Sequence, residues 1–185
     1  HKTLFIFHSD HGEYFRPEGK LLGHGHPVKN KEEALNVFFD NLVHIPLTLW
    51  GVGEKKINKL VSLIDLSPTI LKILDIPTPS EWYGGNLLSE KEKPVICEDV
   101  RHGYKCYSVR TKDWVYAYNE DTNHKYLFKR MPENKKDLSD ERFDVMEHMH
   151  GLLQIHKGKI EECWREYLKN DIDGIIQRDI GVLNK

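Results

Sequence analysis

Residues 3–13 read TLFIFHSDHGE, and this stretch decides how the rest of the chain is interpreted. Its first half is apolar and β-prone, which predicts a strand that is buried on both faces. Asp10 and His11 follow the strand directly, and Gly12 allows the backbone to turn closely there. Because ligands collect beyond the carboxyl ends of strands in open α/β sheets, we expect a site at this strand end.

Asp10 and His11 are the candidate metal ligands. A carboxylate oxygen and an imidazole nitrogen both bind first-row divalent ions. Adjacent residues on an extended strand point in opposite directions, but a turn at the strand end can bring both toward one ion. Two ligands do not complete a site, so the others must come from elsewhere. The alternative is an aspartate that binds backbone amides beside a solvated histidine.

A second histidine pair, His24 and His26, lies in the sequence GHGHP at residues 23–27. Residues two apart on an extended loop face the same side. Either imidazole could bind an anionic oxygen or protonate a leaving group, because histidine titrates near neutral pH. A surface pair without a chemical role is the alternative.

The first half of the chain predicts an α/β arrangement. Residues 31–43 could form a short helix, and residues 44–51 read as a second buried strand. Asp65 or Ser67 could cap a further helix that has Pro68 at its first position. The order of strand, loop, helix, strand and helix suggests a sheet whose strands are joined by crossovers.

The pattern changes after about residue 90. Short aromatic or β-branched runs with turns at 112–113 and 119–123 predict a small antiparallel sheet. Residues 138–176 are then mostly helical. The pattern therefore divides the chain into an α/β part over residues 1–90 and a second part over residues 91–185. Residues 91–185 should form a small antiparallel β subdomain with C-terminal helices.

The composition excludes several classes of protein. The chain has 185 residues and a formal net charge of -2, which argues against nucleic acid as a partner. No apolar run is long enough to span a bilayer. The three cysteines are far apart and read as reduced, structural thiols. Since residue 1 is His and a strand follows almost at once, we expect the chain to begin inside a larger fold. Nothing in the sequence predicts a compartment.

Several motifs in this order resemble a known family. The runs TLFIFHSDHGE, GHGHP and NLVHIPLTLWG, followed by LIDLSPTILKILDIPTP and WYGGNLL, are similar to the C-terminal half of sulfatases in the alkaline phosphatase superfamily. The resemblance continues through YSVRTKDWVYAYN and KYLFKRMPENKKDLSD, to about residue 140. It implies an α/β fold: part of an alkaline-phosphatase-like sheet with flanking helices, a small C-terminal antiparallel sheet and a terminal helix. On this resemblance, residues 1–90 would be the C-terminal part of the α/β catalytic core.

The resemblance also implies roles for four residues. Asp10 and His11 match the family's metal-binding pair. His24 matches a basic residue that contacts the sulfate or phosphate group, and His26 is a nearby alternative for this catalytic role. The family's nucleophile motif, C/S-x-P-x-R, is missing, because CEDVR, CYSVR and CWREY all lack the proline. A missing N-terminal half of the fold should therefore supply the nucleophile and further carboxylates.

The implied function is metal-dependent hydrolysis of a small-molecule sulfate ester. One divalent ion is expected; calcium, zinc and manganese stay alternatives, although the imidazole of His11 favours zinc or manganese over calcium. Two other functions stay open. One is phosphoester or phosphonate hydrolysis, or phosphoethanolamine transfer, within the same superfamily. The other is a non-catalytic remnant that binds an anion or a partner protein.

Overall fold

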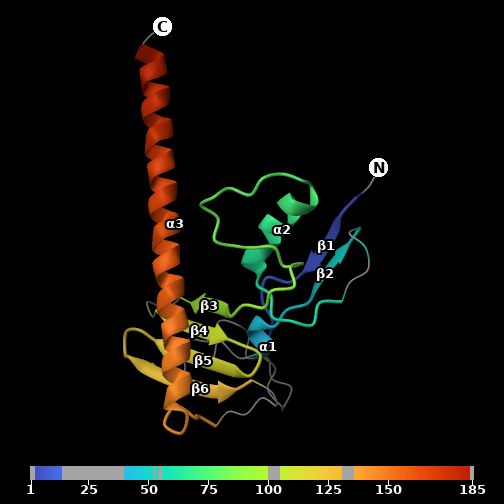
Figure 1. The fold of residues 1–185 in the computed structure, drawn as a ribbon, viewed down its shortest axis with the longest axis vertical. Coiled ribbons are helices and arrows are strands. Elements are labelled where there is room, and N and C mark those ends of the chain that lie inside the picture. The colour runs from blue at the N-terminus through green and yellow to red at the C-terminus, as the bar shows by residue number, and fades with distance from the viewer. Residues whose placement is uncertain are drawn as a thin grey trace. The chain divides into compact units, whose positions relative to one another are not determined.

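The computed structural model describes residues 3–13, 40–51, 53, 56–99, 105–130 and 136–183, the last of these without side chains at residue 170 and beyond residue 171. Contacts divide the chain into two units. The first comprises His1–Leu60 and Glu92–Gly151, and the second comprises Val61–Lys91 and Leu152–Lys185. The elements in chain order are β1 (Phe5–His8), α1 (Asp40–Val43), β2 (Leu47–Trp50), the 3-10 turn η2 (Leu63–Asp65), α2 (Leu66–Ile73), β3 (Val95–Asp99), β4 (Cys106–Arg110), β5 (Trp114–Asn119), β6 (His124–Lys129) and α3 (Phe143–Leu183) (Figure 1).

Four antiparallel strands form the main sheet of the first unit, in the order β3-β4-β5-β6. The predicted small antiparallel sheet is thereby confirmed. Its centre is closely packed: Val109, Tyr116 and Leu127 occupy neighbouring positions on three strands and are fully buried. The hairpin between β5 and β6 is closed by Asn119, whose side-chain oxygen accepts hydrogen bonds from the backbone N–H groups of Asp121 and Thr122.

The first turns of α3 are tied to this sheet by aromatic contacts. The hydroxyl of Tyr116 and Nδ1 of His150 are 2.8 Å apart, and the His150 ring meets the Tyr118 ring edge-on at 5.1 Å. Burial raises the pKa of Tyr116, so its phenol stays protonated at neutral pH. Met146 and Met149 are buried on the same turns. The predicted C-terminal helix is confirmed as α3, which begins a few residues later than residue 138.

The prediction that the first two strands are buried is wrong. Among the strands of the described residues, β1 and β2 pair antiparallel with each other alone, so no crossover between parallel strands joins them. Phe5, Phe7 and Trp50 share one face, and their exposed fractions are 62%, 69% and 75%. The apolar run at residues 3–7 does contain a strand, but its composition does not predict which residues cover each face of that strand.

The second unit is organised around η2 and α2, where buried polar groups connect two segments. Asp65 is 1% exposed, and its carboxylate accepts a 2.7 Å hydrogen bond from the backbone N–H of Gly85. The Thr69 hydroxyl accepts the N–H of Leu87 at 2.9 Å and donates to the backbone carbonyl of Asp65 at 2.6 Å. Gly84 is required here because a Cβ atom would lie 2.0 Å from the backbone oxygen of Ile64.

The expected capping of α2 is corrected by these contacts. Asp65 does occupy the N-cap position, but its side chain makes no capping hydrogen bond and is bonded to Gly85 instead. α2 begins at Leu66, so Pro68 lies at the third helical position rather than the first. Proline is still tolerated there, because the first four N–H groups of a helix have no partner within it.

Replacing Asp65 with alanine should lower the free energy of unfolding by about 1–3 kcal/mol, because the Gly85 N–H would lose a charged acceptor. Asp65→Asn keeps an acceptor oxygen and should be milder. Chemical denaturation measures both, with Asp113→Ala in an exposed turn as the matched control. Equal stability of Asp65→Ala and Asp113→Ala would show that the Asp65 contacts contribute nothing.

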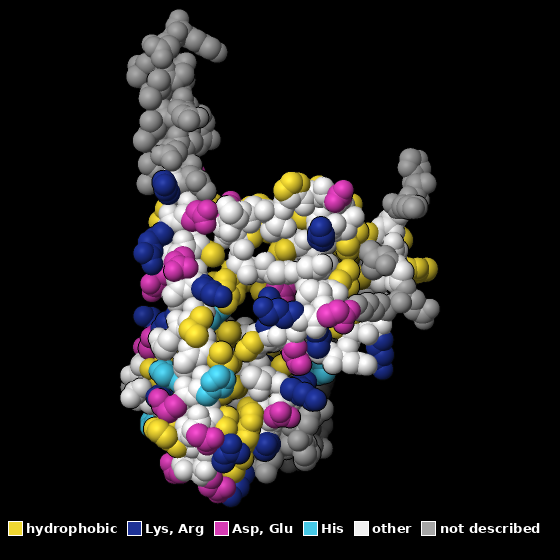
Figure 2. Space-filling model, viewed as in Figure 1, with side chains coloured by type: hydrophobic (Ala, Val, Ile, Leu, Met, Phe, Trp, Pro, Cys, Tyr) yellow, Lys and Arg dark blue, Asp and Glu magenta, His cyan; other side chains and the backbone are white. Residues whose placement is uncertain are grey.

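Charged side chains of both signs are interspersed over the visible face of the described residues (Figure 2). Within the described part of the chain, no helix combines the length and apolar character needed to cross a membrane. The proposed division into residues 1–90 and 91–185 stays a prediction. The two contact-based units are each assembled from separate stretches of chain.

Candidate functional site

Asp10 and His11 lie directly after β1, as the sequence predicted. Oδ1 of Asp10 is 3.7 Å from Nε2 of His11 and accepts a 3.0 Å hydrogen bond from the His11 backbone N–H. The turn at the strand end therefore brings the two side chains together, although they are adjacent in sequence. Both are accessible to solvent, with side-chain exposed fractions of 85% and 43%.

Local hydrogen bonds set the chemical state of this pair. His11 Nδ1 lies 2.7 Å from the carbonyl oxygen of Gly12. A carbonyl can only accept, so Nδ1 carries the proton, and Nε2 holds the lone pair when the ring is neutral. The pKa of Asp10 is held below its usual range, first by a hydrogen bond from its own backbone N–H and then by the nearby His11. Asp10 is therefore a carboxylate at neutral pH.

Gly12 fastens this strand end to α1. Its N–H donates to the carbonyl of Leu42 at 2.7 Å. A Cβ atom at residue 12 would lie only 2.0 Å from the backbone oxygen of Asn41. Such a distance is far inside van der Waals contact, so only glycine allows this approach. The glycine was expected to permit a close turn, and the structure identifies α1 as the segment that it approaches.

An ion pair holds α1 against the main sheet. The guanidinium of Arg110, at the end of β4, pairs with the carboxylate of Asp40. Arg110 is 5% exposed as a residue, while the Asp40 side chain is 21% exposed. Val43, also on α1, packs against the buried Cys106 and Ala117. A continuous chain of contacts thus runs from the sheet through α1 and Gly12 to the Asp10–His11 pair.

The donor types of the pair fit a divalent metal. Two ligand atoms bound at about 2.0–2.2 Å to one ion lie roughly 3–4 Å apart, so the 3.7 Å separation is compatible with shared coordination. Two donors are fewer than a site requires. Among the described residues, no group of three or more His, Cys, Asp or Glu side chains could hold a metal ion. His24 and His26 lie outside the described residues, and their roles stay predictions.

Two of the three cysteines, Cys97 and Cys106, have raised pKa values. All three thiols are free. Burial and, secondarily, Glu98 raise the pKa of Cys97 to about 11. Burial, with Asp99 and Asp121, raises the pKa of Cys106 to about 11 as well. Both are therefore protonated thiols at neutral pH, which agrees with the predicted structural role.

Sequence reasoning missed the residues that position the site. Arg110 lies in the motif YSVRTKDWVYAYN, from which no role for this residue was predicted. Asp40 carried no prediction of its own. One signal for the ion pair was present in the sequence. Arg110 is a charged residue at the end of a strand otherwise made of apolar and small residues, and a charge is rarely buried without a partner.

Comparisons with known proteins point to one family. No family model matches the chain. The chain is 30% identical over 182 residues to the "uncharacterized sulfatase YidJ" of Escherichia coli, an alignment that covers 89% of this chain and 34% of the relative. It is also 30% identical over 140 residues to human arylsulfatase K, covering 64% of this chain and 24% of that protein. The chain thus spans between about a quarter and a third of these relatives.

Solved structures agree on the fold. A candidate sulfatase from Bacteroides thetaiotaomicron superposes with a TM-score of 0.65 at 19% identity, covering 88% of this chain and 38% of the other. A protein described as a 2-O GAG sulfatase gives a TM-score of 0.63 at 18% identity, with the same coverage of both chains. The resemblance to sulfatases and the α/β fold class are confirmed.

Proposed function

We propose that this chain, which belongs to the sulfatase family, contributes part of the active site of an enzyme that hydrolyses sulfate esters. The observation that carries the proposal is the Asp10–His11 pair. In a chain aligned with sulfatases, it places a carboxylate and an imidazole 3.7 Å apart at a strand end. The motif SDHGE predicts these two residues, and the distance between their side chains supports the proposal that they act as one donor group.

Asp10 and His11 are the residues that would hold one divalent ion. When bound, such an ion lowers the pKa of a nucleophilic oxygen and neutralises charge on the transferring group. Asp10 contributes a negative charge, and its lowered pKa extends the pH range of that charge below the usual one for aspartate. His11 contributes Nε2, because its Nδ1 proton is engaged by the Gly12 carbonyl. Gly12 and α1 fix the orientation of both.

The remaining roles are assigned to residues beyond this pair. His24, with His26 as the alternative, would contact the anionic oxygens of the substrate and assist the leaving group. The nucleophile would come from outside this chain, on a segment equivalent to the rest of the relatives' length. The substrate class is a small-molecule sulfate ester, and the ion is zinc, manganese or calcium.

Phosphoester chemistry is the second candidate, and His11 is the observation that favours it. An imidazole suits zinc or manganese better than calcium. A zinc or manganese site of this kind serves phosphoester or phosphonate hydrolysis, or phosphoethanolamine transfer, as readily as sulfate hydrolysis. A role in binding an anion or a partner without catalysis is the third alternative.

Substitution of Asp10 by alanine in the full-length protein should reduce both bound metal and turnover. We expect kcat/KM for an aryl sulfate to fall by about 10²–10³-fold, the usual effect of removing one charge-stabilising group. Metal content is measured by elemental analysis, and turnover is measured in parallel on 4-nitrophenyl sulfate and 4-nitrophenyl phosphate. Asp140→Ala, in an exposed turn, is the matched control.

The outcomes separate the alternatives. Unchanged metal content in Asp10→Ala would show that the ligand assignment is wrong. Faster hydrolysis of the phosphate ester than of the sulfate ester would favour the second candidate. The absence of turnover on both esters by a metal-loaded protein would favour the non-catalytic role.

A further inference from the structure

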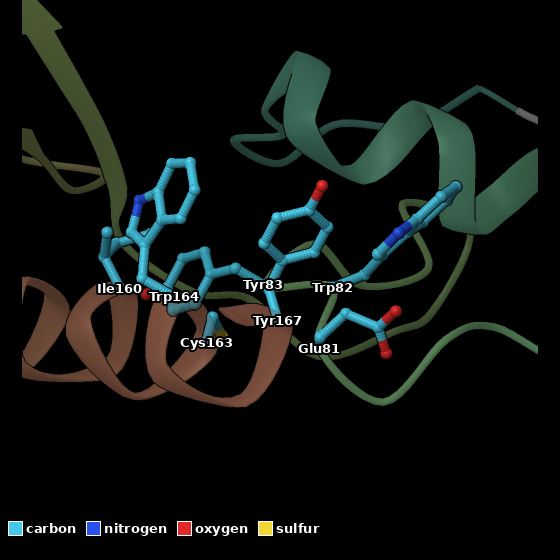
Figure 3. A pocket seen from close by; sticks show the side chains of 7 residues that line it. All are labelled: Glu81, Trp82, Tyr83, Ile160, Cys163, Trp164 and Tyr167. Carbon is cyan, nitrogen blue, oxygen red and sulfur yellow. The ribbon is translucent and has the colours of Figure 1, made fainter. Parts of the chain in front are cut away.

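The second unit contains a cleft that the proposed hydrolysis does not use (Figure 3). Its volume is about 360 Å³, which is at the lower end of the range for small-molecule sites of roughly 300–1,000 Å³. It lies between the segment that follows α2 and the middle of α3. The described residues that line it are Glu81, Trp82, Tyr83, Ile160, Cys163, Trp164 and Tyr167.

The walls of the cleft are held together by side-chain hydrogen bonds. The Tyr83 hydroxyl lies 3.0 Å from Nδ1 of His156, and the two rings meet edge-on at 4.9 Å. Further along α3, Glu166 accepts a 3.0 Å hydrogen bond from the Ser80 hydroxyl. Because His156 is only 7% exposed, the first of these contacts is anchored in the core of the unit. The segment that carries Glu81 and Trp82 is therefore fixed against the helix.

Aromatic faces dominate the accessible lining. Trp82, Trp164 and Tyr167 are 42%, 58% and 48% exposed. The rings of Trp164 and Tyr167 lie 5.9 Å apart and nearly perpendicular, at 88°. Figure 3 shows Trp82, Tyr83 and Trp164 extending to the same side of the cleft. The negative faces of such rings attract cations, and indole is the best of the aromatic groups for this.

The charge at the cleft has a single sign. Among the described residues that line it, Glu81 is the one charged side chain, and no lysine or arginine is present. Its Oε2 lies 3.4 Å from the Ser80 hydroxyl, which also contacts Glu166. The Glu81 carboxylate in the lining, with that of Glu166 on the other side of Ser80, disfavours the binding of sulfate, phosphate and other anions in the cleft.

We propose that this cleft binds a small organic cation, of the alkylated ammonium class, between the tryptophan and tyrosine rings and the Glu81 carboxylate. The rings would surround the alkyl groups, and Glu81 would supply the opposite charge. The proposal does not depend on sulfate-ester hydrolysis. It adds a second ligand, of opposite charge to a sulfate ester, to a different part of the chain.

The test compares two probes of the same shape. Choline and its uncharged isostere 3,3-dimethyl-1-butanol are titrated into the full-length protein by calorimetry. If cation–π attraction drives binding, choline should bind about tenfold or more tightly than the alcohol. Equal affinity for the two probes would overturn the proposal, as would the absence of saturable choline binding. Tighter binding of an uncharged sugar than of choline would overturn it too.

Amino-acid substitutions test whether choline binds in this cleft. Trp164→Leu should weaken choline binding by about tenfold or more, because Trp164 is an accessible indole in the cleft. Glu81→Gln should weaken it by about threefold, with the effect shrinking at high salt. Trp50→Leu, at an exposed tryptophan of β2 outside the cleft, should leave choline affinity unchanged. A loss with Trp50→Leu equal to that with Trp164→Leu would place the cation elsewhere.

Discussion

Replacing Asp40 with alanine is expected to lower the free energy of unfolding by about 3–5 kcal/mol. The carboxylate of Asp40 faces the guanidinium of Arg110, which is 5% exposed and cannot turn to solvent. Removing one member of a buried ion pair leaves the other charge with less compensation. Thermal or urea denaturation of the full-length protein measures the change.

The partner variant should be milder. Arg110→Met preserves most of the side-chain volume and removes the more deeply buried charge, whereas the remaining Asp40 is 21% exposed and can be hydrated. The double variant Asp40→Ala, Arg110→Met should regain part of the stability lost by Asp40→Ala alone, because the buried guanidinium is then removed together with its carboxylate.

An exposed ion pair in the same unit provides the control. Arg142 contacts Asp144 through two hydrogen bonds of 3.1 Å, but their side chains are 45% and 70% exposed. The pKa of Asp144 is lowered by the hydrogen bonds from Arg142, yet solvent screens the pair, and Arg142→Met should destabilise the protein much less than Asp40→Ala. If Asp40→Ala is no more harmful than Arg142→Met, the Arg110–Asp40 pair does not hold α1 in place.

The elements that the sequence predicted correctly are those determined by neighbouring residues. β4, β5 and β6 contain aromatic and β-branched residues and are flanked by turn residues such as Asn119, and each hairpin closes within a few positions. α3 likewise follows from a long helical pattern. Such local signals need no knowledge of the rest of the chain.

The errors concern interactions between residues far apart in sequence. Asp65 has the right chemistry for a helix cap, but its partner is the N–H of Gly85, 20 positions away. Arg110 reaches across to α1. The apolar sequence of β1 predicts a strand, but cannot predict that Phe5 and Phe7 are exposed beside a single partner strand. The same holds for the candidate site. The motif predicted its two donor residues, but it could not predict the contacts that orient them.

Gly12→Ala is expected to disable the site more than it destabilises the fold. A methyl group at residue 12 would meet the backbone oxygen of Asn41 at 2.0 Å, and backbone atoms cannot rotate aside. The strand end must then move away from α1 and lose the hydrogen bond from the Gly12 N–H to Leu42. His11 would lose the fixed position of the Gly12 carbonyl that orients its ring.

A displacement of about 1 Å at positioned groups can cost 10²-fold in rate, so we expect that loss in kcat/KM of the full-length protein, together with weaker metal binding. The stability cost should stay near 1–3 kcal/mol, the usual range for overpacking.

Gly158→Ala is the matched control, because a Cβ atom there meets nothing within 4 Å and alanine favours a helix. Hydrogen exchange of the backbone amide at position 12 reports the contact directly: it should speed up in Gly12→Ala and remain unchanged in Gly158→Ala. If Gly12→Ala keeps the protection of this amide and retains turnover, the close approach to α1 does not position Asp10 and His11.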